Sequence, residues 1–315
     1  MKNFLKSILF LIILAVLVEG ISFLFIPGNN IKKYGLYKVS AYDILAEDTD
    51  TIDVIAVGDS LIYSSLSPMV IWNQLGYTVF DCAEPAQIIP DTLDYLKVAI
   101  ESQHPKIILM EANVLFRDPS KKKTETIITK RIKNRIPIIK YHDNWKKYIS
   151  YGSKKNWINY YKGYKFITKV KPSKPKKYMS GSKKSREIPK GNIEYFEQIL
   201  ELCKENNTKL VLVSFPTQLT WSSKKHNAIQ QLSEKYELEF VDLNLVDLGI
   251  NWETDTKDSG GHLNYLGAKK VSEYIGTYLQ NTNLLQDHRD EKKYASWHKA
   301  YQMYLKKYQK TLNKN

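Results

Sequence analysis

The chain has 315 residues, of which 43% are hydrophobic and 25% charged, and its formal net charge is +14. This length is enough to bury a complete α/β core, and the composition is ordinary for a folded protein. The two cysteines, Cys82 and Cys203, fall in a predicted strand and a predicted helix, so we expect buried free thiols and not a disulfide. No spacing of Cys and His resembles a zinc site, and we expect neither a metal nor a cofactor.

The first predicted element is an apolar helix. Residues 7–26 are almost uninterruptedly apolar, and a helix of about 20 such residues matches the thickness of a bilayer core. Lys2 and Lys6 precede this stretch, which favours a cytoplasmic amino terminus. We therefore predict a single-pass anchor in the cell membrane over residues 1–27 and an extracytoplasmic domain. The competing interpretation is a signal peptide cleaved near Gly20. If the stretch is an anchor, Glu19 within it is costly in lipid and points to a membrane partner.

After a connector over residues 28–50, apolar runs alternate with helical patterns. Such alternation predicts an α/β domain with a parallel sheet, here divided between residues 51–116 and 191–284. Five strands joined by crossover helices favour a three-layer α/β/α sandwich of the flavodoxin-like type. The predicted strands are Ile52–Gly58, Thr78–Cys82, Lys106–Glu111, Lys209–Phe215 and Glu239–Leu243, and the predicted helices lie near 68–75, 90–102, 193–205 and 267–275.

Residues 117–190 break this alternation and form a basic insertion. They contain 24 Lys and Arg against 4 Asp and Glu, a surplus of 20 positive charges in a chain whose total is +14. Tyr and Trp alternate with the cations, as in 141–145. Outside the cytoplasm this pattern favours an anionic membrane surface or an anionic wall polymer as partner and not nucleic acid. The first half, with apolar residues 136–139, is expected to fold and cover the site; residues 169–190 are either folded or a solvated, partly disordered segment.

A basic, Tyr-rich tail over residues 285–315 ends the chain. Its helical pattern covers 292–315, and its apolar residues are sparse. The pattern predicts a surface helix that docks on the domain, the membrane or a partner, and the sequence leaves these three open.

Two polar residues far apart in the sequence suggest a catalytic site. Ser60 follows the first predicted strand, which stops at Gly58, and His262 lies in a Gly-rich loop that directly precedes the last predicted helix. Ligands of open α/β sheets bind at the carboxyl ends of the strands, so these two side chains could meet there. Together with an aspartate they would form a nucleophilic triad.

The same two stretches resemble a known family. Residues 57–61, Val-Gly-Asp-Ser-Leu, are similar to the first signature of the SGNH or GDSL hydrolases, and residues 258–264 are similar to the last. The resemblance implies that Ser60 is the nucleophile and His262 the general base. The family's acid lies three residues before the histidine, where this chain has Ser259. We therefore predict Asp258 as the acid, with Asp255 as the alternative.

The resemblance also implies donors for the oxyanion. In the second signature this chain has Ala83 and Ala86 where glycines are usual, but the donor there is a backbone N–H, which alanine also carries. Asn113, after the third predicted strand, is the candidate for the side-chain donor, although it lacks the usual preceding glycine.

In layout the chain looks like the membrane-anchored, extracytoplasmic group of such proteins, similar to teichoic-acid D-alanylation and alginate-type O-acetylation proteins. The resemblance implies a serine acyltransferase or esterase that adds or removes acyl groups, acetyl groups first, on a cell-surface polysaccharide or teichoic-acid-like polymer. It also implies a membrane-bound O-acyltransferase as partner. The acyl group, the acceptor, and the choice between transfer and hydrolysis stay open. The alternative, motivated by the displaced acid and the missing glycines, is a non-catalytic module that binds an anionic polymer or a membrane partner.

Overall fold

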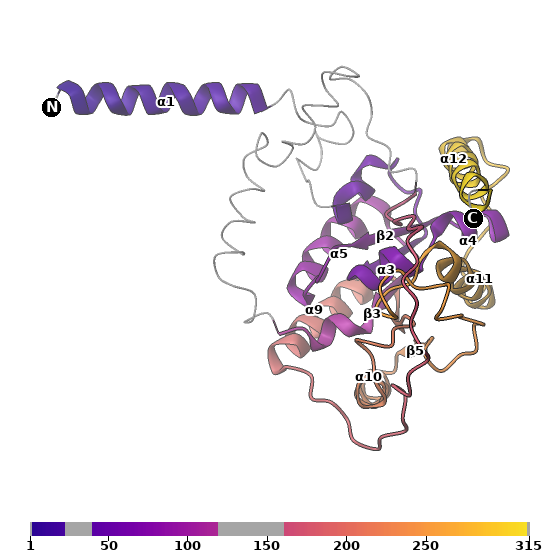
Figure 1. The fold of residues 1–315 in the computed structure, drawn as a ribbon. Helices are drawn as coiled ribbons and strands as arrows, with labels where there is room; N and C mark the ends of the chain where they lie inside the picture. Colours follow the sequence, from indigo (N-terminus) through magenta and orange to yellow (C-terminus); the bar gives the residue numbers. More distant parts are fainter. Residues whose placement is uncertain (1, 23–39, 119–160, 314–315) are drawn as a thin grey trace.

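The fold is built on a five-stranded parallel sheet. The computed structural model describes residues 2–22, 40–118 and 161–313, and the strand order is β2-β1-β3-β4-β5 (Figure 1). All five predicted strands are present, so the predicted parallel sheet is confirmed. The strands are β1 (Val54–Gly58), β2 (Val79–Ala83), β3 (Ile107–Glu111), β4 (Lys209–Ser214) and β5 (Glu239–Asp242).

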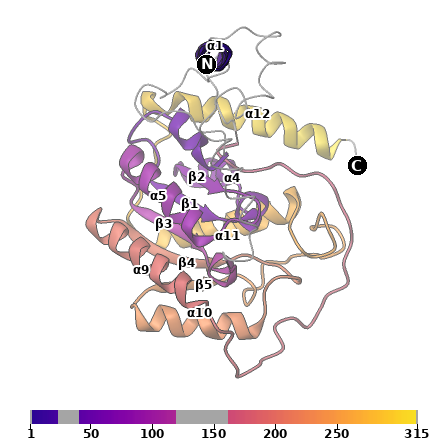
Figure 2. The same ribbon diagram turned by 90° about the vertical axis from the view of Figure 1, so that its left-hand side faces the viewer.

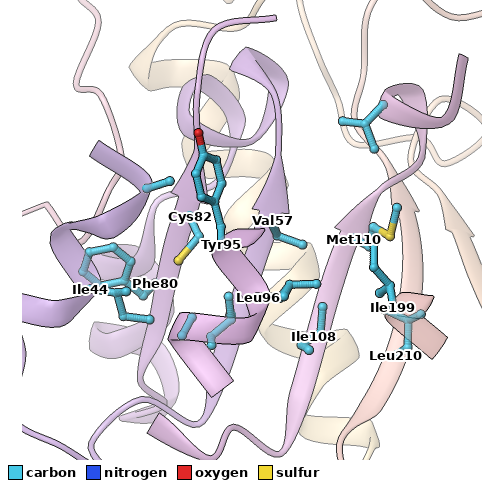
Figure 3. Close-up of a cluster of buried hydrophobic side chains, with 14 of the residues drawn as sticks. Ile44, Val57, Phe80, Cys82, Tyr95, Leu96, Ile108, Met110, Ile199 and Leu210 are labelled. Carbon is cyan, nitrogen blue, oxygen red and sulfur yellow. The ribbon is translucent and has the colours of Figure 1, made fainter. Parts of the chain in front are cut away.

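Helices cover both faces of the sheet. Successive side chains of a strand point to opposite faces, so Val57 packs in one buried cluster and Ala56 in the other. One face carries α5 (Ile89–Gln103), α9 (Lys190–Glu205) and α10 (Ser223–Lys235); the other carries α3 (Ser60–Ser65), α4 (Pro68–Leu75) and α11 (Tyr265–Asn281). Figure 3 shows Leu96 of α5 and Ile199 of α9 beside strand residues of the first cluster. The three layers agree with the prediction, but α10 was not predicted. Its apolar residues are few, although a parallel crossover between β4 and β5 requires such an element.

A short helix before β1 belongs to the core and not to a connector. The 3₁₀ helix η2 covers Ser40–Ala46, and its Ala41 and Ile44 are each 1% exposed. Ile44 lies beside Phe80 of β2 (Figure 3). Cys82, at the end of β2, is buried in the same cluster, and both cysteines are free thiols as predicted.

The predicted anchor forms helix α1 (Lys2–Ser22), whose large apolar side chains, such as Phe4 and Leu11, are exposed. Among the residues that the structure describes, no helix meets the length and hydropathy required to cross a bilayer. The transmembrane helix expected from the sequence is therefore not found.

The second half of the basic insertion runs along the outside of the domain to the start of α9 (Figures 1 and 2). Residues 164–174, called here the strap, form backbone hydrogen bonds with the loop that carries His262. Ile167 accepts from the Tyr265 N–H at 2.9 Å, and the Lys171 N–H donates to Thr256 O at 3.0 Å. Residues 169–174 are thus hydrogen-bonded to the domain, although all of them except Ser173 are exposed to solvent. The prediction that the first half covers the site falls mainly on residues 119–160, which lie outside the described residues.

One lysine of the insertion is buried outright. Lys162 is 0% exposed, pairs with Glu47 at 2.6 Å, and holds its ammonium 4.5 Å from the centre of the Trp297 ring. Trp297 belongs to the carboxyl-terminal helix α12 (Ala295–Leu312), which follows the 3₁₀ turn η5 (Lys292–Tyr294). The centre of the Trp297 ring lies 5.3 Å from that of the Trp72 ring in α4. The sequence left the domain, the membrane and a partner open as docking surfaces for the tail helix. In the structure this helix packs on the domain.

Candidate active site

Ser60 is placed at the carboxyl edge of the sheet by a tight turn after β1. A Cβ at Gly58 would lie 2.5 Å from the Cβ of Glu111, so only glycine fits where β1 passes β3. Asp59 then caps α3, because its Oδ1 accepts the Leu61 N–H at 2.9 Å. Ser60 is thus the first residue of a short helix whose start is fixed on both sides.

His262 reaches Ser60 from the other end of the chain. It lies two residues before Asn264, whose side chain caps α11 by accepting the Leu266 N–H at 3.0 Å. The Ser60 Oγ and the His262 Nε2 are 2.7 Å apart, although 202 positions separate the two residues. The predicted encounter of these residues at the strand ends is therefore present in the structure.

Asp258 completes the arrangement. Its Oδ2 lies 2.6 Å from the His262 Nδ1, and its Oδ1 accepts the His262 backbone N–H at 2.7 Å. An ionised carboxylate only accepts, so Nδ1 carries the proton and Nε2 is left to accept from the Ser60 hydroxyl. This is the tautomer that a general base requires.

The position of the acid, one residue earlier than in the family pattern, has a backbone explanation. Ser259 and Gly260 have φ values of 64° and 91°, two successive residues outside the usual right-handed regions. They fold the loop sharply enough to return the Asp258 carboxylate to the imidazole despite the additional residue. Asp255, the alternative acid, instead pairs with Lys270 at 2.7 Å. The structure thus brings Asp258, and not Asp255, to the imidazole.

Two layers of contacts hold this loop. Thr256 Oγ1 accepts the Gly260 N–H at 2.8 Å and donates to His262 O at 2.9 Å. From outside, the strap adds the bond from the Ser259 N–H to Lys171 O, at 3.0 Å. The insertion therefore helps to position the catalytic loop, a role that its composition gave no reason to expect.

The oxyanion candidates are distributed around the nucleophile. Ala83 ends β2 directly opposite Gly58 in the parallel register, and Ala86 has a φ of 52° and lines a surface cleft together with Asn113. The Asn113 Nδ2 lies 3.5 Å from the carboxylate of Asp59, a long contact that leaves its N–H groups largely available. Of the three candidates, Ala86 and Asn113 share one cleft, whereas Ala83 is buried in the strand end.

Charged groups are buried next to Ser60. Asp59 is 0% exposed, and its Oδ2 accepts from the guanidinium of Arg117, which follows the 3₁₀ helix η3 (Ala112–Phe116). Glu111 is also fully buried; its Oε1 accepts the Asn113 N–H at 2.8 Å, and its Oε2 has no hydrogen-bond partner in the described structure. Burial, with the nearby Asp59, raises the pKa of Glu111 well above its usual value. Burial therefore favours the protonated form of Glu111, whereas Asp59 has a cationic partner.

Tyr63 is a site residue that the sequence analysis missed. Burial raises the pKa of the Tyr63 hydroxyl, and the nearby Ser60 acts in the opposite direction. The ammonium of Lys165, from the strap, lies 3.8 Å from the centre of the Tyr63 ring, and that of Lys257 lies at 5.9 Å. The available signal was spacing, because a residue three positions after Ser60 shares its face of a helix.

Within residues 2–22, 40–118 and 161–313, no group of three or more His, Cys, Asp or Glu side chains is placed to hold a metal ion. What the described residues do form is the nucleophile, base and orienting acid of a serine hydrolase, made from Ser60, His262 and Asp258.

Comparison with known protein families gives no match, and no curated protein matches the chain. Among solved structures, a lipolytic protein of the G-D-S-L family from Desulfitobacterium hafniense is similar at 11% identity and a TM-score of 0.41, over 71% of this chain and 97% of that one. A lipase/acylhydrolase from Enterococcus faecalis has 12% identity and a TM-score of 0.41, over 73% and 97%. A family 3 carbohydrate esterase from Clostridium thermocellum has 12% identity and a TM-score of 0.39, over 73% and 96%. Identity and TM-scores are low, so the chemistry of the site rests on its own geometry.

Proposed function

We propose that this protein is a serine esterase or acyltransferase of the SGNH type that removes or transfers acyl groups, acetyl groups first, on hydroxyls of a cell-surface polysaccharide or wall polymer. The observation that carries the proposal is the continuous hydrogen-bonded series from Ser60 Oγ through the His262 imidazole to the Asp258 carboxylate, at 2.7 and 2.6 Å. Such a series is what activates a serine hydroxyl for attack on a carbonyl.

The steps follow from the positions of these groups. Ser60 Oγ attacks the acyl carbonyl carbon while its proton passes to His262 Nε2. Asp258 stabilises the imidazolium through Nδ1. The oxyanion is held by the Ser60 N–H and by donors from the Ala86 and Asn113 side of the site. When the tetrahedral intermediate collapses, the leaving alkoxide takes the proton from Nε2 and an acyl-serine remains.

The second half of the reaction decides between the two activities. His262 takes a proton from an incoming hydroxyl, whose oxygen attacks the acyl-serine and releases Ser60. If the hydroxyl belongs to water the enzyme is an esterase, and if it belongs to a sugar the enzyme is a transferase. The triad performs both reactions in the same way, so the positioning of the acceptor makes the difference.

Further parts of the proposal come from the sequence. They are a location at the cell membrane with the amino terminus in the cytoplasm and the catalytic domain outside, an anionic membrane surface as contact, and a membrane-bound O-acyltransferase as acyl supplier. Protease accessibility of the domain in intact cells tests the location, and protection from added protease would contradict it. Co-purification of membrane proteins with the wild type and with Glu19→Leu tests the partner.

Intact-mass analysis tests the chemistry. The full chain is exposed to an activated acetyl ester, and we expect wild type to gain one acetyl group that Ser60→Ala does not. His262→Ala is expected to slow the adduct's formation strongly. Ser65→Ala is the matched control, since Ser65 lies on the same helix with a buried hydroxyl that has no hydrogen-bond partner in the described structure.

The opposite outcome favours the alternative function. If wild type forms no adduct and turns over no ester, whereas an anionic polymer binds equally to wild type and Ser60→Ala, the protein is a binding module. The displaced acid was one motive for that alternative, and the contact between Asp258 and His262 removes it.

A further inference from the structure

A cleft opens beside the nucleophile on the side of Asn113. Its volume is about 690 Å³, and it lies between η3, the loop before α10 and the last part of the insertion. Its basic lining residues are Arg117, Arg186 and Lys225, against one carboxylate, Asp118, among the described residues. The remaining lining residues are uncharged, and they include Asn113, Leu219 and Ser222.

Two residues that line the cleft lie against the residues that directly precede Ser60 and His262 in the chain. Arg117 donates to the carboxylate of Asp59, the residue before Ser60. Leu219 lies close to Gly261, the residue before His262: a Cβ at Gly261 would lie 3.2 Å from the Leu219 Cδ1. The cleft thus lies next to the two segments that carry Ser60 and His262, and it is the described cleft toward which a substrate bound at Ser60 would extend.

Arg117 is paired with the carboxylate of Asp59, but the hydrogen bonds of Lys225 in the described structure include no carboxylate. Lys225 Nζ donates to two neutral oxygens, Asn113 Oδ1 and Thr220 O. Burial, with the nearby Arg186 and Arg117, lowers the pKa of Lys225 to about 8, although Glu111 and Asp59 act in the opposite direction. Burying an ammonium beside two guanidinium groups costs free energy unless an anion joins them.

The amino terminus of α10 adds to the positive electrostatic potential of the cleft. Ser222, the N-cap of this 13-residue helix, lines the cleft, and the first turn contains no acidic residue. A helix amino terminus favours an anion and disfavours a lysine, yet Lys225 of the cleft lies in the first turn of α10. Arg186 is held at this point by a backbone hydrogen bond from its N–H to Lys224 O, at 2.8 Å.

We propose that this cleft is a phosphate subsite, in which Arg186, Lys225 and the amino terminus of α10 bind a phosphate group carried by the substrate that reacts at Ser60. A guanidinium, an ammonium and a helix terminus match the several oxygens and the charge of a phosphate better than the single charge of a carboxylate. The inference rests on the proposed function for its substrate, but the binding itself does not depend on catalysis.

The first test measures binding without chemistry. Glucose 1-phosphate is titrated calorimetrically into the full-length wild type, Arg186→Gln, Lys225→Gln and Lys224→Gln, with methyl glucoside as the uncharged ligand. We expect wild type to bind the phosphate and not the glucoside, and each of the first two variants to weaken the phosphate Kd by about tenfold. Lys224→Gln is the matched control, with the same loss of charge one residue away on an exposed side chain. It is expected to stay within about twofold of wild type.

The second test measures selectivity in catalysis. The ratio of kcat/KM for 6-O-acetylglucose 1-phosphate to that for the 6-O-acetyl methyl glucoside is expected to exceed one in wild type and to fall about tenfold in Arg186→Gln. Arg186 is exposed, so this variant guards against a folding defect in Lys225→Gln.

The outcomes separate the two claims. Equal phosphate binding by all four proteins, or none by wild type, overturns the subsite even if both esters are hydrolysed. No turnover of either ester by wild type overturns the proposed function, and the titration then still decides whether the cleft binds phosphate. Tight binding of acetate or glucuronate at the same residues, with weaker binding of phosphate, would show a carboxylate subsite and refute the phosphate assignment.

Discussion

Replacing Asp258 by asparagine tests the assignment of the acid. The two side chains have the same shape, so the amide oxygen of the variant can still accept the His262 backbone N–H that Asp258 Oδ1 accepts at 2.7 Å. The position 2.6 Å from His262 Nδ1 then holds an NH₂ group, which donates. It therefore selects the tautomer in which Nδ1 accepts and Nε2 carries the proton. That tautomer presents a donor to Ser60 and cannot take its proton.

The size of the effect depends on how far water can replace the lost contact. In serine proteases with a buried aspartate, this change lowers kcat by about 10⁴, which is close to 5 kcal/mol. The Asp258 side chain is 38% exposed, and that of His262 is 24% exposed. Water can therefore reorient part of the imidazole population, and we expect a smaller loss in kcat of about 10²- to 10³-fold, or roughly 3–4 kcal/mol.

The assay is steady-state hydrolysis of 4-nitrophenyl acetate by wild type, Asp258→Asn and Asp255→Asn. We expect KM to change little in Asp258→Asn, because the lost interaction acts in the transition state. Asp255→Asn loses the ion pair with Lys270, so its thermal stability should fall while its kcat stays within about threefold of wild type. A kcat for Asp258→Asn within about threefold of wild type, together with a large loss in Asp255→Asn, would refute the assignment.

Three further substitutions test the supports of the site. Gly58→Ala places a Cβ 2.5 Å from that of Glu111; we expect a loss of about 1–3 kcal/mol in urea unfolding and a reduced kcat, and unchanged stability would contradict the close approach. Gly260→Ala, at a φ of 91° with Ser173 Oγ 3.2 Å from the new Cβ, should cost about 1–3 kcal/mol and lower kcat because it distorts the catalytic loop, and a kcat equal to wild type would show that the loop tolerates the change. Glu111 has a raised pKa in the folded state, so folding favours its protonated carboxyl. The stability that this group contributes is complete below its pKa in the unfolded chain and is lost as pH rises through its pKa in the folded protein. As pH rises above about 5, the melting temperature of wild type should therefore fall relative to that of Glu111→Gln, and parallel curves would mean that Glu111 titrates normally.

Much of the fold was available from local sequence pattern. The β-branched and apolar runs are short, bounded by polar turns and separated by helical periodicity, and these properties determine strand identity and parallel topology without knowledge of distant contacts. Helix α10 was missed because its apolar residues are few. The 3₁₀ helix η2 was assigned to a connector because its three buried residues are too few to give a period.

Some residues of the site could be predicted from the sequence, and others could not. Ser60 and His262 could be named from their neighbours, because each directly follows or precedes a recognisable element. Tyr63 was within reach through helical spacing. Arg117 and the strap were not, because their partners lie tens to hundreds of positions away and only folding brings them together.

The sequence by itself determined the five strands, the placement of a serine and a histidine at their carboxyl ends, and the excess of cations in the insertion. Local propensity and periodicity act over a few residues, and these features need no more than that. The tertiary structure decided which aspartate reaches the imidazole, where the cations of residues 161–190 lie, and that this part of the insertion holds the loop that carries His262. Each of these depends on backbone dihedrals or on contacts between distant segments, as Ser259 and Gly260 show by turning Asp258 toward His262.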